Sequence, residues 1–150
     1  DRPTAEAAVS AASHVRHFTP EGDPKLFRCQ CGRKECEAPP PSRILLLTLD
    51  LMRDAYGAPL VATSGPRCAW WNSHEEGDPK SEHLHGDGAD LMCEGSSVRW
   101  KMLDAAKAAG FRRVGIGRIF LHVGVSTRQE HPADVVWHYY PKPNPSGAAA

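Results

Sequence analysis

The ten residues SEHLHGDGAD, positions 81–90, carry the most informative pattern in this chain of 150 residues. His83 and Asp90 lie seven positions apart, with Gly86 and Gly88 between them. Side chains alternate between the faces of a strand, so two residues at this spacing share a side only if the chain turns between them. Glycine adopts backbone conformations that other residues avoid. We therefore predict that His83 and Asp90 converge, and that a strand starts just after the second glycine.

A third polar residue interrupts the later apolar run IFLHVGV, residues 119–125. If this run is a strand, Leu121 and the two valines share one face, which we expect to be core. His122 lies on the other face, between Phe120 and Gly124. We predict that this histidine faces a groove, that the glycine leaves room beside it, and that the phenylalanine walls a substrate pocket.

Histidine and aspartate are good zinc ligands, and three protein ligands leave a fourth position open, as in catalytic zinc sites. We predict that His83, Asp90 and His122 hold one zinc ion, which activates water and polarises a carbonyl oxygen. Arg67 follows a strand that ends at Gly65-Pro66, and its guanidinium suits a substrate carboxylate or an oxyanion. The predicted reaction is metal-assisted hydrolysis of an amide.

Each of these residues also has a simpler interpretation when it is taken alone. The His83–Asp90 pair is also compatible with a surface loop, His122 with a core histidine, and Arg67 with a salt bridge. The hydrolase prediction therefore depends on the coincidence of all four residues. A plain interaction domain with structural histidines is the competing hypothesis.

Composition limits the classes of partner. Lysine plus arginine and aspartate plus glutamate both number 18, so charge gives no argument for nucleic acid or an anionic membrane. No apolar run approaches the ~20 residues of a spanning helix. We expect a single α+β domain over residues 14–140, with an arm at 1–13 and a disordered tail or linker at 141–150. Its elements would be a small sheet and two main helices.

Local signals place these elements. A helix is expected from a Ser42 N-cap to Gly57 and should be mostly buried. Its expected inner face is formed by Ile44, Leu47, Leu51 and Ala55, and it is widened by Leu45, Leu49, Met52 and Tyr56. A second helix is expected from an N-cap at Ser96 or Ser97 to residue 109. Strands are expected at residues 14–18, 60–64, 89–93 and 135–140. Residues 114–117 and 119–125 are expected to form a strand pair or one long bent strand.

Five cysteines cannot all pair within one chain. Cys29, Cys31 and Cys36 form a C-x-C-x4-C cluster, and with a fourth ligand such as Cys68 they would make a second, structural zinc site. A Cys31–Cys36 disulfide is the alternative if the chain works outside the cytoplasm. Free buried thiols are the third interpretation, which Cys93 shares.

Three ordered motifs resemble zinc D-Ala-D-Ala carboxypeptidase-like peptidases. They are SGPR-x4-N at residues 64–72, S-x-H-x2-G-x3-D at 81–90, and G-x-G followed by F-L-H-V at 115–123. The segment FRCQCG at 27–32 is similar to a cysteine-bearing segment of the phage and bacterial branch. The resemblance covers about residues 18–125. It implies the fold shared with hedgehog signalling domains, in which an antiparallel sheet lines a zinc cleft.

The resemblance also implies peptidoglycan as substrate, cut in its stem peptides by a D,D-carboxypeptidase or an endopeptidase, as in phage endolysins. It carries the zinc-ligand role to His83, Asp90 and His122, and the substrate-carboxylate or transition-state role to Arg67. Asn72 and Ser81 would shape the site. We expect a monomer that acts on the cell wall, hence periplasmic, extracellular or phage-associated.

One departure concerns the general base. Relatives carry an acid or a histidine beside the last ligand, at positions that here hold Ile119, Phe120 and Gly124. None of these accepts a proton. Either another group serves, or the domain is a non-catalytic zinc-bearing module that binds the cell wall. The groups that could serve as general base instead are His85, Asp87, Glu82 and His138, in that order. A further alternative is that the loop over residues 127–134 supplies the base, from Glu130 or His131.

Overall fold

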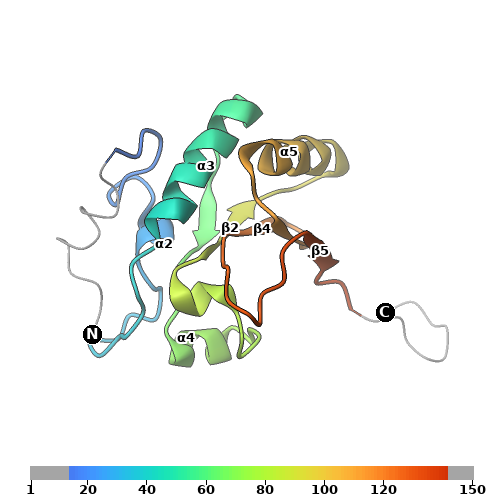
Figure 1. Cartoon of the computed structure of the whole chain (residues 1–150). Coiled ribbons are helices and arrows are strands. Elements are labelled where there is room, and N and C mark those ends of the chain that lie inside the picture. The colour runs from blue at the N-terminus through green and yellow to red at the C-terminus, as the bar shows by residue number, and fades with distance from the viewer. Residues whose placement is uncertain (1–13, 142–150) are drawn as a thin grey trace, which may run out of the picture.

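The structure is a computed structural model that describes residues 14–141 (Figure 1). The expected arm at 1–13 and nearly all of the expected tail lie outside the described residues. The predicted α+β fold is confirmed. The elements in chain order are α2 (Pro24–Phe27), α3 (Arg43–Tyr56), β1 (Ala62–Ser64), α4 (Ala69–His74), the 3-10 helix η1 (Glu82–His85), β2 (Gly88–Met92), α5 (Ser96–Ala109), β3 (Arg113–Ile116), β4 (Phe120–Gly124) and β5 (Val135–His138).

The five strands form one sheet in the order β1-β2-β4-β3-β5. Its three inner pairings are antiparallel, as expected, but β5 runs parallel to β3. Both β3 and β5 run opposite to β4, so they run in the same direction as each other. Because β5 pairs with β3, this last pairing is parallel. The last strand therefore extends the sheet at its outer edge.

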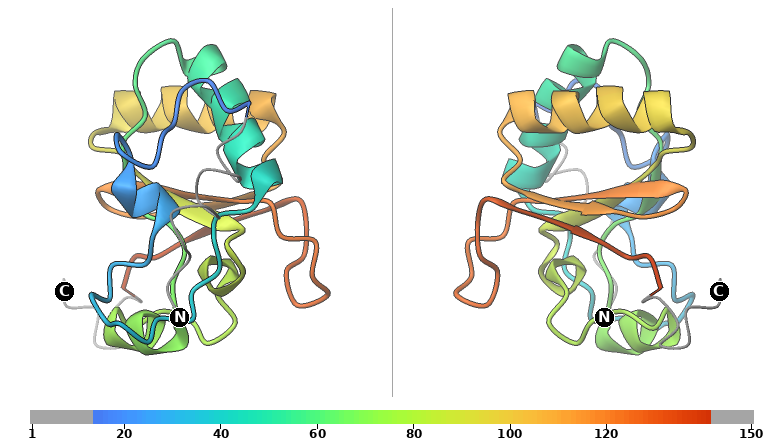
Figure 2. Two further views of the ribbon diagram at one scale, coloured as in Figure 1. Left: turned by 90° about the vertical axis from the view of Figure 1, so that its left-hand side faces the viewer. Right: turned by 90° about the vertical axis from the view of Figure 1, so that its right-hand side faces the viewer.

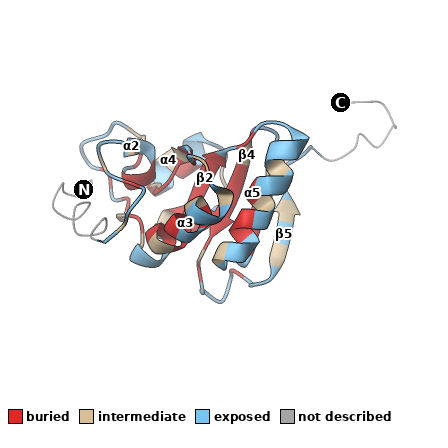
Figure 3. Cartoon of the chain, turned by 90° about the horizontal axis from the view of Figure 1, so that it is seen from above, coloured by how far each residue is buried: buried red, intermediate tan, exposed pale blue. Residues whose placement is uncertain are grey.

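Helices α3 and α5 cover one face of the sheet, while η1 and α4 lie on the other side (Figure 2). Leu91, Leu121 and Val123 are fully buried beneath the two helices, as the strand pattern predicts. Seen from above, the buried positions of α3 and α5 face each other and the sheet (Figure 3). One apolar layer thus supports the sheet and leaves its opposite face for polar chemistry.

Helix α3 has the predicted ends. The Ser42 hydroxyl accepts a hydrogen bond from the Leu45 N–H at 3.3 Å, and Gly57 adopts a left-handed φ of 77°. The expected inner face is correct for Leu45, Leu49 and Met52, which are fully buried, but wrong for Ile44 and Leu51, which are 58% and 54% exposed. The buried stripe is instead shifted around the helix by one residue and begins at Leu45, since so many leucines follow one another that the pattern alone does not fix the face. The fully buried members are Leu45, Leu46, Leu49 and Met52.

Two further local predictions need correction. Residues 14–18 are not a strand: the N–H groups of Arg16 and His17 donate to the buried Asp50 carboxylate at 2.7 and 3.0 Å, which fixes this segment against α3. Helix α5 has its N-cap at Gly95 rather than at a serine, and no side chain caps it. None of the helices in the described part of the chain is long and apolar enough to cross a membrane.

Candidate functional site

The candidate site lies on a single row across the polar face of the sheet. In register, Ser64 pairs with Asp90, Asp90 with His122, His122 with Gly115, and Gly115 with Trp137. Residues paired across neighbouring strands point to the same face. The register of the four pairings thus brings together side chains from four of the five strands, and the fifth strand, β3, contributes a glycine that leaves room for its neighbours.

The helix η1 delivers His83 to this row. The Ser81 hydroxyl caps the helix by accepting from the His83 N–H at 3.2 Å, and Gly86 ends it with a left-handed φ of 72°. The predicted turn between His83 and Asp90 therefore exists, and it depends on the first glycine. Gly88 has another role, because a Cβ at this position would lie 2.8 Å from the His122 ring.

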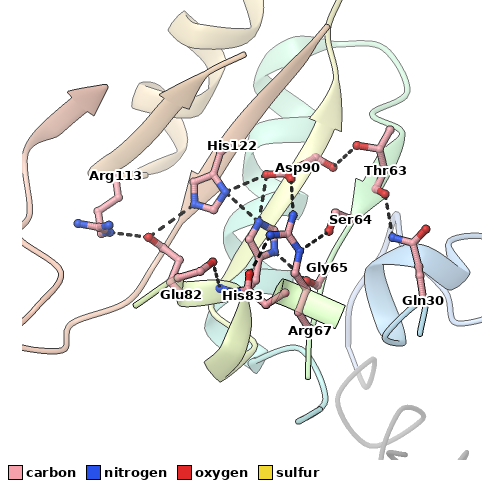
Figure 4. A network of polar contacts seen from close by, with 12 residues as sticks. Gln30, Thr63, Ser64, Gly65, Arg67, Glu82, His83, Asp90, Arg113 and His122 are labelled. Carbon is pink, nitrogen blue, oxygen red and sulfur yellow. Dashed lines mark hydrogen bonds and ion pairs between the residues drawn. The ribbon is translucent and has the colours of Figure 1, made fainter. Parts of the chain in front are cut away.

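His83, Asp90 and His122, the His–Asp–His cluster, converge on one point (Figure 4). His83 Nε2 lies 3.1 Å from Asp90 Oδ1, and His122 Nδ1 lies 2.9 Å from the same oxygen and 3.2 Å from His83 Nε2. Tetrahedral zinc with bonds of ~2.0–2.2 Å separates its ligand atoms by roughly 3.3–3.6 Å. The triangle is slightly tighter than that, and all three residues are buried.

The ring nitrogens outside the triangle fix how the imidazoles are oriented. His83 Nδ1 lies 2.7 Å from the Gly65 carbonyl, which only accepts, so this nitrogen donates and Nε2 presents its lone pair to the cluster. His122 Nε2 lies 3.5 Å from Glu82 Oε2, so the same logic points the lone pair of Nδ1 to the cluster. Metal-bound histidines are oriented by such outer partners, and the donor set therefore fits zinc.

The electrostatics of the cluster also favour a cation. Burial lowers the pKa of His83. Burial alone would raise the pKa of Asp90, but the two histidines hold it well below its usual range. For His122, hydrogen bonds to Asp90 and Glu82 outweigh burial and raise the pKa to about 9. The carboxylates thus stay charged and favour positive charge within the cluster, either as a proton on His122 or as a metal cation that takes the place of this proton.

Glu82 is buried on the outer side of His122, at 2% exposure. Its Oε2 accepts from Arg113 Nε at 2.6 Å, and Arg113 also donates to the Pro132 carbonyl at 2.6 Å. A Cβ at Gly124 would lie 1.4 Å from Glu82 Oε1, so the carboxylate fills the space that this glycine leaves. From the sequence, Glu82 is only the third candidate for a proton acceptor, and Arg113 is not a candidate at all. The available signal is the pair of glycines, Gly88 and Gly124, that make room for Glu82.

Arg67 is anchored beside the cluster. Its Nη2 donates to Asp90 Oδ2 at 3.1 Å, its Nε to the Ser64 hydroxyl at 3.2 Å, and its Nη1 to Asn72 Oδ1 at 3.2 Å. Asn72 in turn donates to the Asp78 carbonyl at 2.8 Å. The guanidinium therefore shares the Asp90 carboxylate with the two histidines, through the other oxygen.

The remaining proton-acceptor candidates are less central. His85 and Asp87 are half-buried at the end of η1 and just after it, and no contact of their side chains with the three donors is seen in the described part of the chain. His138 pairs in register with Ile116, on the sheet face opposite to His122. Glu130 pairs with Arg128 at the surface.

His131, the other substitute from the loop after β4, is buried. Its Nδ1 lies 2.6 Å from the Ser126 hydroxyl, and its Nε2 contacts the Lys80 carbonyl. Both ring nitrogens are thus occupied: Nδ1 bonds within the loop, and Nε2 ties the loop to the segment before η1.

An aromatic wall that the sequence analysis did not identify closes one side of the site. The Trp137 ring lies 5.5 Å from the His122 ring, and Tyr139 lies 5.2 Å from Phe120. Gly115 permits this approach, because a Cβ there would lie 2.6 Å from Tyr139. Burial raises the pKa of Tyr139 to about 12, and the charges of Asp90 and Glu82 add to the effect. The alternation within residues 135–140 was the signal that pairs Trp137 with Tyr139.

The cysteines form a second group. Cys29, Cys31, Cys36 and Cys68 place their sulfur atoms within 4.8 Å of one another, so Cys68 joins the predicted cluster. All five cysteines are free, and the alternative Cys31–Cys36 disulfide is absent from the described structure. Cys93 lies elsewhere, in the main core.

Two comparisons with known proteins bear on this arrangement. A family model described as Peptidase M15 matches residues 16–126. That range holds the His–Asp–His cluster, Arg67 and all four clustered cysteines, and it ends before β5. No curated protein matches the chain.

Proposed function

The chain belongs to the M15 family of zinc D-Ala-D-Ala carboxypeptidase-like peptidases, and on that premise we propose that it hydrolyses amide bonds in peptidoglycan stem peptides. The proposed reaction is that of a D,D-carboxypeptidase or an endopeptidase. One observation carries the proposal: three buried donor atoms converge within 3.2 Å of one another, beside a guanidinium bonded to the same aspartate. Since one chain supplies every part, we propose that a monomer is active.

In this proposal His83, Asp90 and His122 hold the zinc ion. They supply two neutral ring nitrogens and one carboxylate oxygen, the number of protein ligands that catalytic zinc sites use. Zinc in such a site lowers the pKa of water to about 7 and polarises a carbonyl oxygen. Burial of all three side chains limits exchange with bulk solvent and strengthens their electrostatic interactions.

Arg67 is proposed to bind the substrate carboxylate or the oxyanion of the tetrahedral intermediate. A guanidinium has five N–H donors, and three of the Arg67 donors are used by Asp90, Ser64 and Asn72. The remaining two are available for a substrate, from a group that its neighbours already hold in place. Asn72 and Ser81 are proposed to shape the site, through Arg67 and η1 respectively.

The aromatic wall and Phe120 are proposed to contact the substrate. Phe120 and His122 project from the same face of β4, and the Phe120 ring packs against Tyr139. His85 and Asp87 remain our proposed proton acceptors, because they flank Gly86 at the exit from η1, close in the chain to His83. Glu82 has a distinct proposed role, that of orienting His122 from its outer nitrogen.

A second function has one observation in its favour. Glu82 is the carboxylate that contacts His122 besides Asp90, yet it is paired with Arg113 and lies on the ring nitrogen outside the donor triangle. A centre without a proton acceptor would bind zinc and wall peptide with little turnover. The alternative is therefore a non-catalytic zinc-bearing cell-wall-binding module on the same fold.

One experiment separates these functions. The purified chain is incubated with peptidoglycan and with synthetic stem peptides, and new amino groups and released D-alanine are quantified. We expect release that stops after chelation, returns with added zinc, and is absent in His83→Ala but present in the control His74→Ala on the exposed face of α4. Zinc and wall binding without new amino groups would establish the module, and a chain that binds no zinc would exclude both.

A further inference from the structure

The cysteine cluster lies apart from the candidate active site and has the geometry of a metal site. Cys29 Sγ and Cys68 Sγ are 3.7 Å apart. A disulfide requires about 2.05 Å, whereas four thiolates around zinc at ~2.3 Å lie roughly 3.8 Å from one another. All four sulfur atoms fall within 4.8 Å of one another, and Cys31 alone among the four residues is not fully buried. These distances are compatible with four thiolates around one tetrahedral metal ion.

Backbone donors point at these sulfur atoms. The Cys68 N–H donates to Cys29 Sγ, the Arg33 N–H to Cys31 Sγ, and the Trp71 N–H to Cys68 Sγ, each at 3.4 Å. Sulfur accepts hydrogen bonds weakly as a thiol and more strongly as a thiolate, and metals bind the thiolate. Three such donors in one small cluster therefore favour the metal-binding form.

We propose that Cys29, Cys31, Cys36 and Cys68 bind one zinc ion in a closed, structural site. Four protein ligands leave no position for water, which distinguishes structural from catalytic zinc. An all-sulfur donor set selects a soft-tolerant, tetrahedral metal over magnesium or calcium. This inference goes beyond the proposed peptidase activity, because it concerns other residues and another role.

The location of the site indicates what the metal would hold in place. Cys68 directly follows Arg67, and the Arg67 N–H donates to the His83 carbonyl at 3.0 Å. Gln30, between two of the cysteines, donates to the Thr63 carbonyl at 3.0 Å, and the Thr63 hydroxyl donates to the Asp90 carbonyl at 3.3 Å (Figure 4). The zinc would therefore fasten the 29–36 loop to the segments that carry Arg67 and Asp90. The cysteines act here as positioning residues.

Metal content tests the proposal in the full chain, purified from zinc-supplemented medium without a metal-binding tag. We expect two zinc ions per chain by elemental analysis, one in Cys31→Ser and one in His122→Ala. Cys93→Ser is the matched control, a buried cysteine outside the cluster that should keep both ions. Cys31 is chosen because it is the least buried of the four, which limits the damage to folding.

Cobalt substitution provides a second readout, which is spectroscopic and independent of activity. Cobalt bound by thiolates shows sulfur-to-cobalt charge-transfer absorption, which we expect in the unmodified chain and in His122→Ala but not in Cys31→Ser. Alkylation followed by peptide mapping should show these four cysteines protected until a chelator is added. A cobalt chain without this absorption, or alkylation of the four at one rate with and without metal, overturns the proposal. Retained absorption in His122→Ala supports it even if no amide is hydrolysed.

Discussion

The two candidate metal clusters differ in where their ligands come from and in what surrounds them. The His–Asp–His cluster joins η1 to two paired strands, mixes nitrogen with oxygen, and is flanked by Arg67 and Glu82. The cysteine cluster is formed mainly by loops, contains only sulfur, and is surrounded by backbone N–H groups. A reactive metal site needs rigid elements and charged neighbours that orient its ligands. A site that only ties loops together needs four protein ligands of one kind, which leave no position for water.

The largest expected effect follows from Asp90→Ala, which should remove zinc from the His–Asp–His cluster alone. Amide hydrolysis should become undetectable, while charge-transfer absorption of the cobalt chain persists. Arg67, whose side chain is 13% exposed, would lose its carboxylate partner, and breaking a buried pair costs about 3–5 kcal/mol. Urea unfolding measures this loss, with the exposed Asp104→Ala on α5 as control. Loss of both metals would show that the clusters are not independent.

The next effect concerns stability and the cysteine cluster. With free zinc at a hundred times its dissociation constant, the site should stabilise the fold by ~2.7 kcal/mol. Cys36→Ser should lose this zinc-dependent increment but keep the increment that the His–Asp–His cluster supplies. Thermal unfolding with and without added zinc measures both, and Cys93→Ser should behave as wild type. If zinc stabilises Cys36→Ser as much as it stabilises wild type, the cysteine cluster does not bind a structural zinc ion.

A smaller effect is expected from Glu82→Gln, which keeps the shape of the side chain but removes its charge. Loss of an outer partner of a metal-bound histidine typically lowers metal affinity about 10–100-fold. Competition with a chromogenic chelator should show this decrease at one of the two sites. The control Glu94→Gln, at an exposed position after β2, should leave both affinities unchanged. A decrease at the cysteine cluster would count against the proposed role of Glu82.

The smallest effect is a pH dependence of stability in the chelated chain. Burial would raise the pKa of Glu82, but His122 and Arg113 lower it below its usual value. A carboxyl group with a depressed folded pKa contributes stability above its unfolded pKa of about 4.3, and this contribution is lost as the pH falls through the folded value. The difference in the free energy of unfolding between wild type and Glu82→Gln should therefore shrink in acid. If this free-energy difference stays constant from neutral pH into acid, the charge of Glu82 does not contribute to the stability of the fold.

Much of the His–Asp–His cluster could be predicted from the sequence, because local rules act on it. Strand alternation separates His122 from its apolar neighbours, and a glycine permits the turn after His83. The position of Glu82 could not be predicted in this way. It depends on the β2–β4 register, which sets Gly88 opposite Gly124 and opens the space that the carboxylate fills.

Other features depend on contacts between distant segments. Cys68 joins the first three cysteines only because β1 brings its following turn beside the loop that begins at Cys29, 39 positions earlier. Asp50 captures two backbone N–H groups of residues 16 and 17, which overrides their strand-like alternation. No local sequence pattern predicts which distant segment a loop contacts, or which distant side chain accepts a hydrogen bond from a backbone N–H.

The contact between Glu82 and Gly124 ties two distant positions to a single volume. Because a Cβ at position 124 would lie 1.4 Å from Glu82 Oε1, no larger residue fits there while the glutamate keeps its place. A glutamate at position 82 and a side chain at position 124 therefore exclude each other. A larger residue at 124 requires a smaller or differently oriented residue at 82. Homologues with a carboxylate at the position of Gly124 should therefore carry a smaller or outward-pointing residue at the position of Glu82. We expect these two positions to vary together, with one of them supplying the acid beside His122.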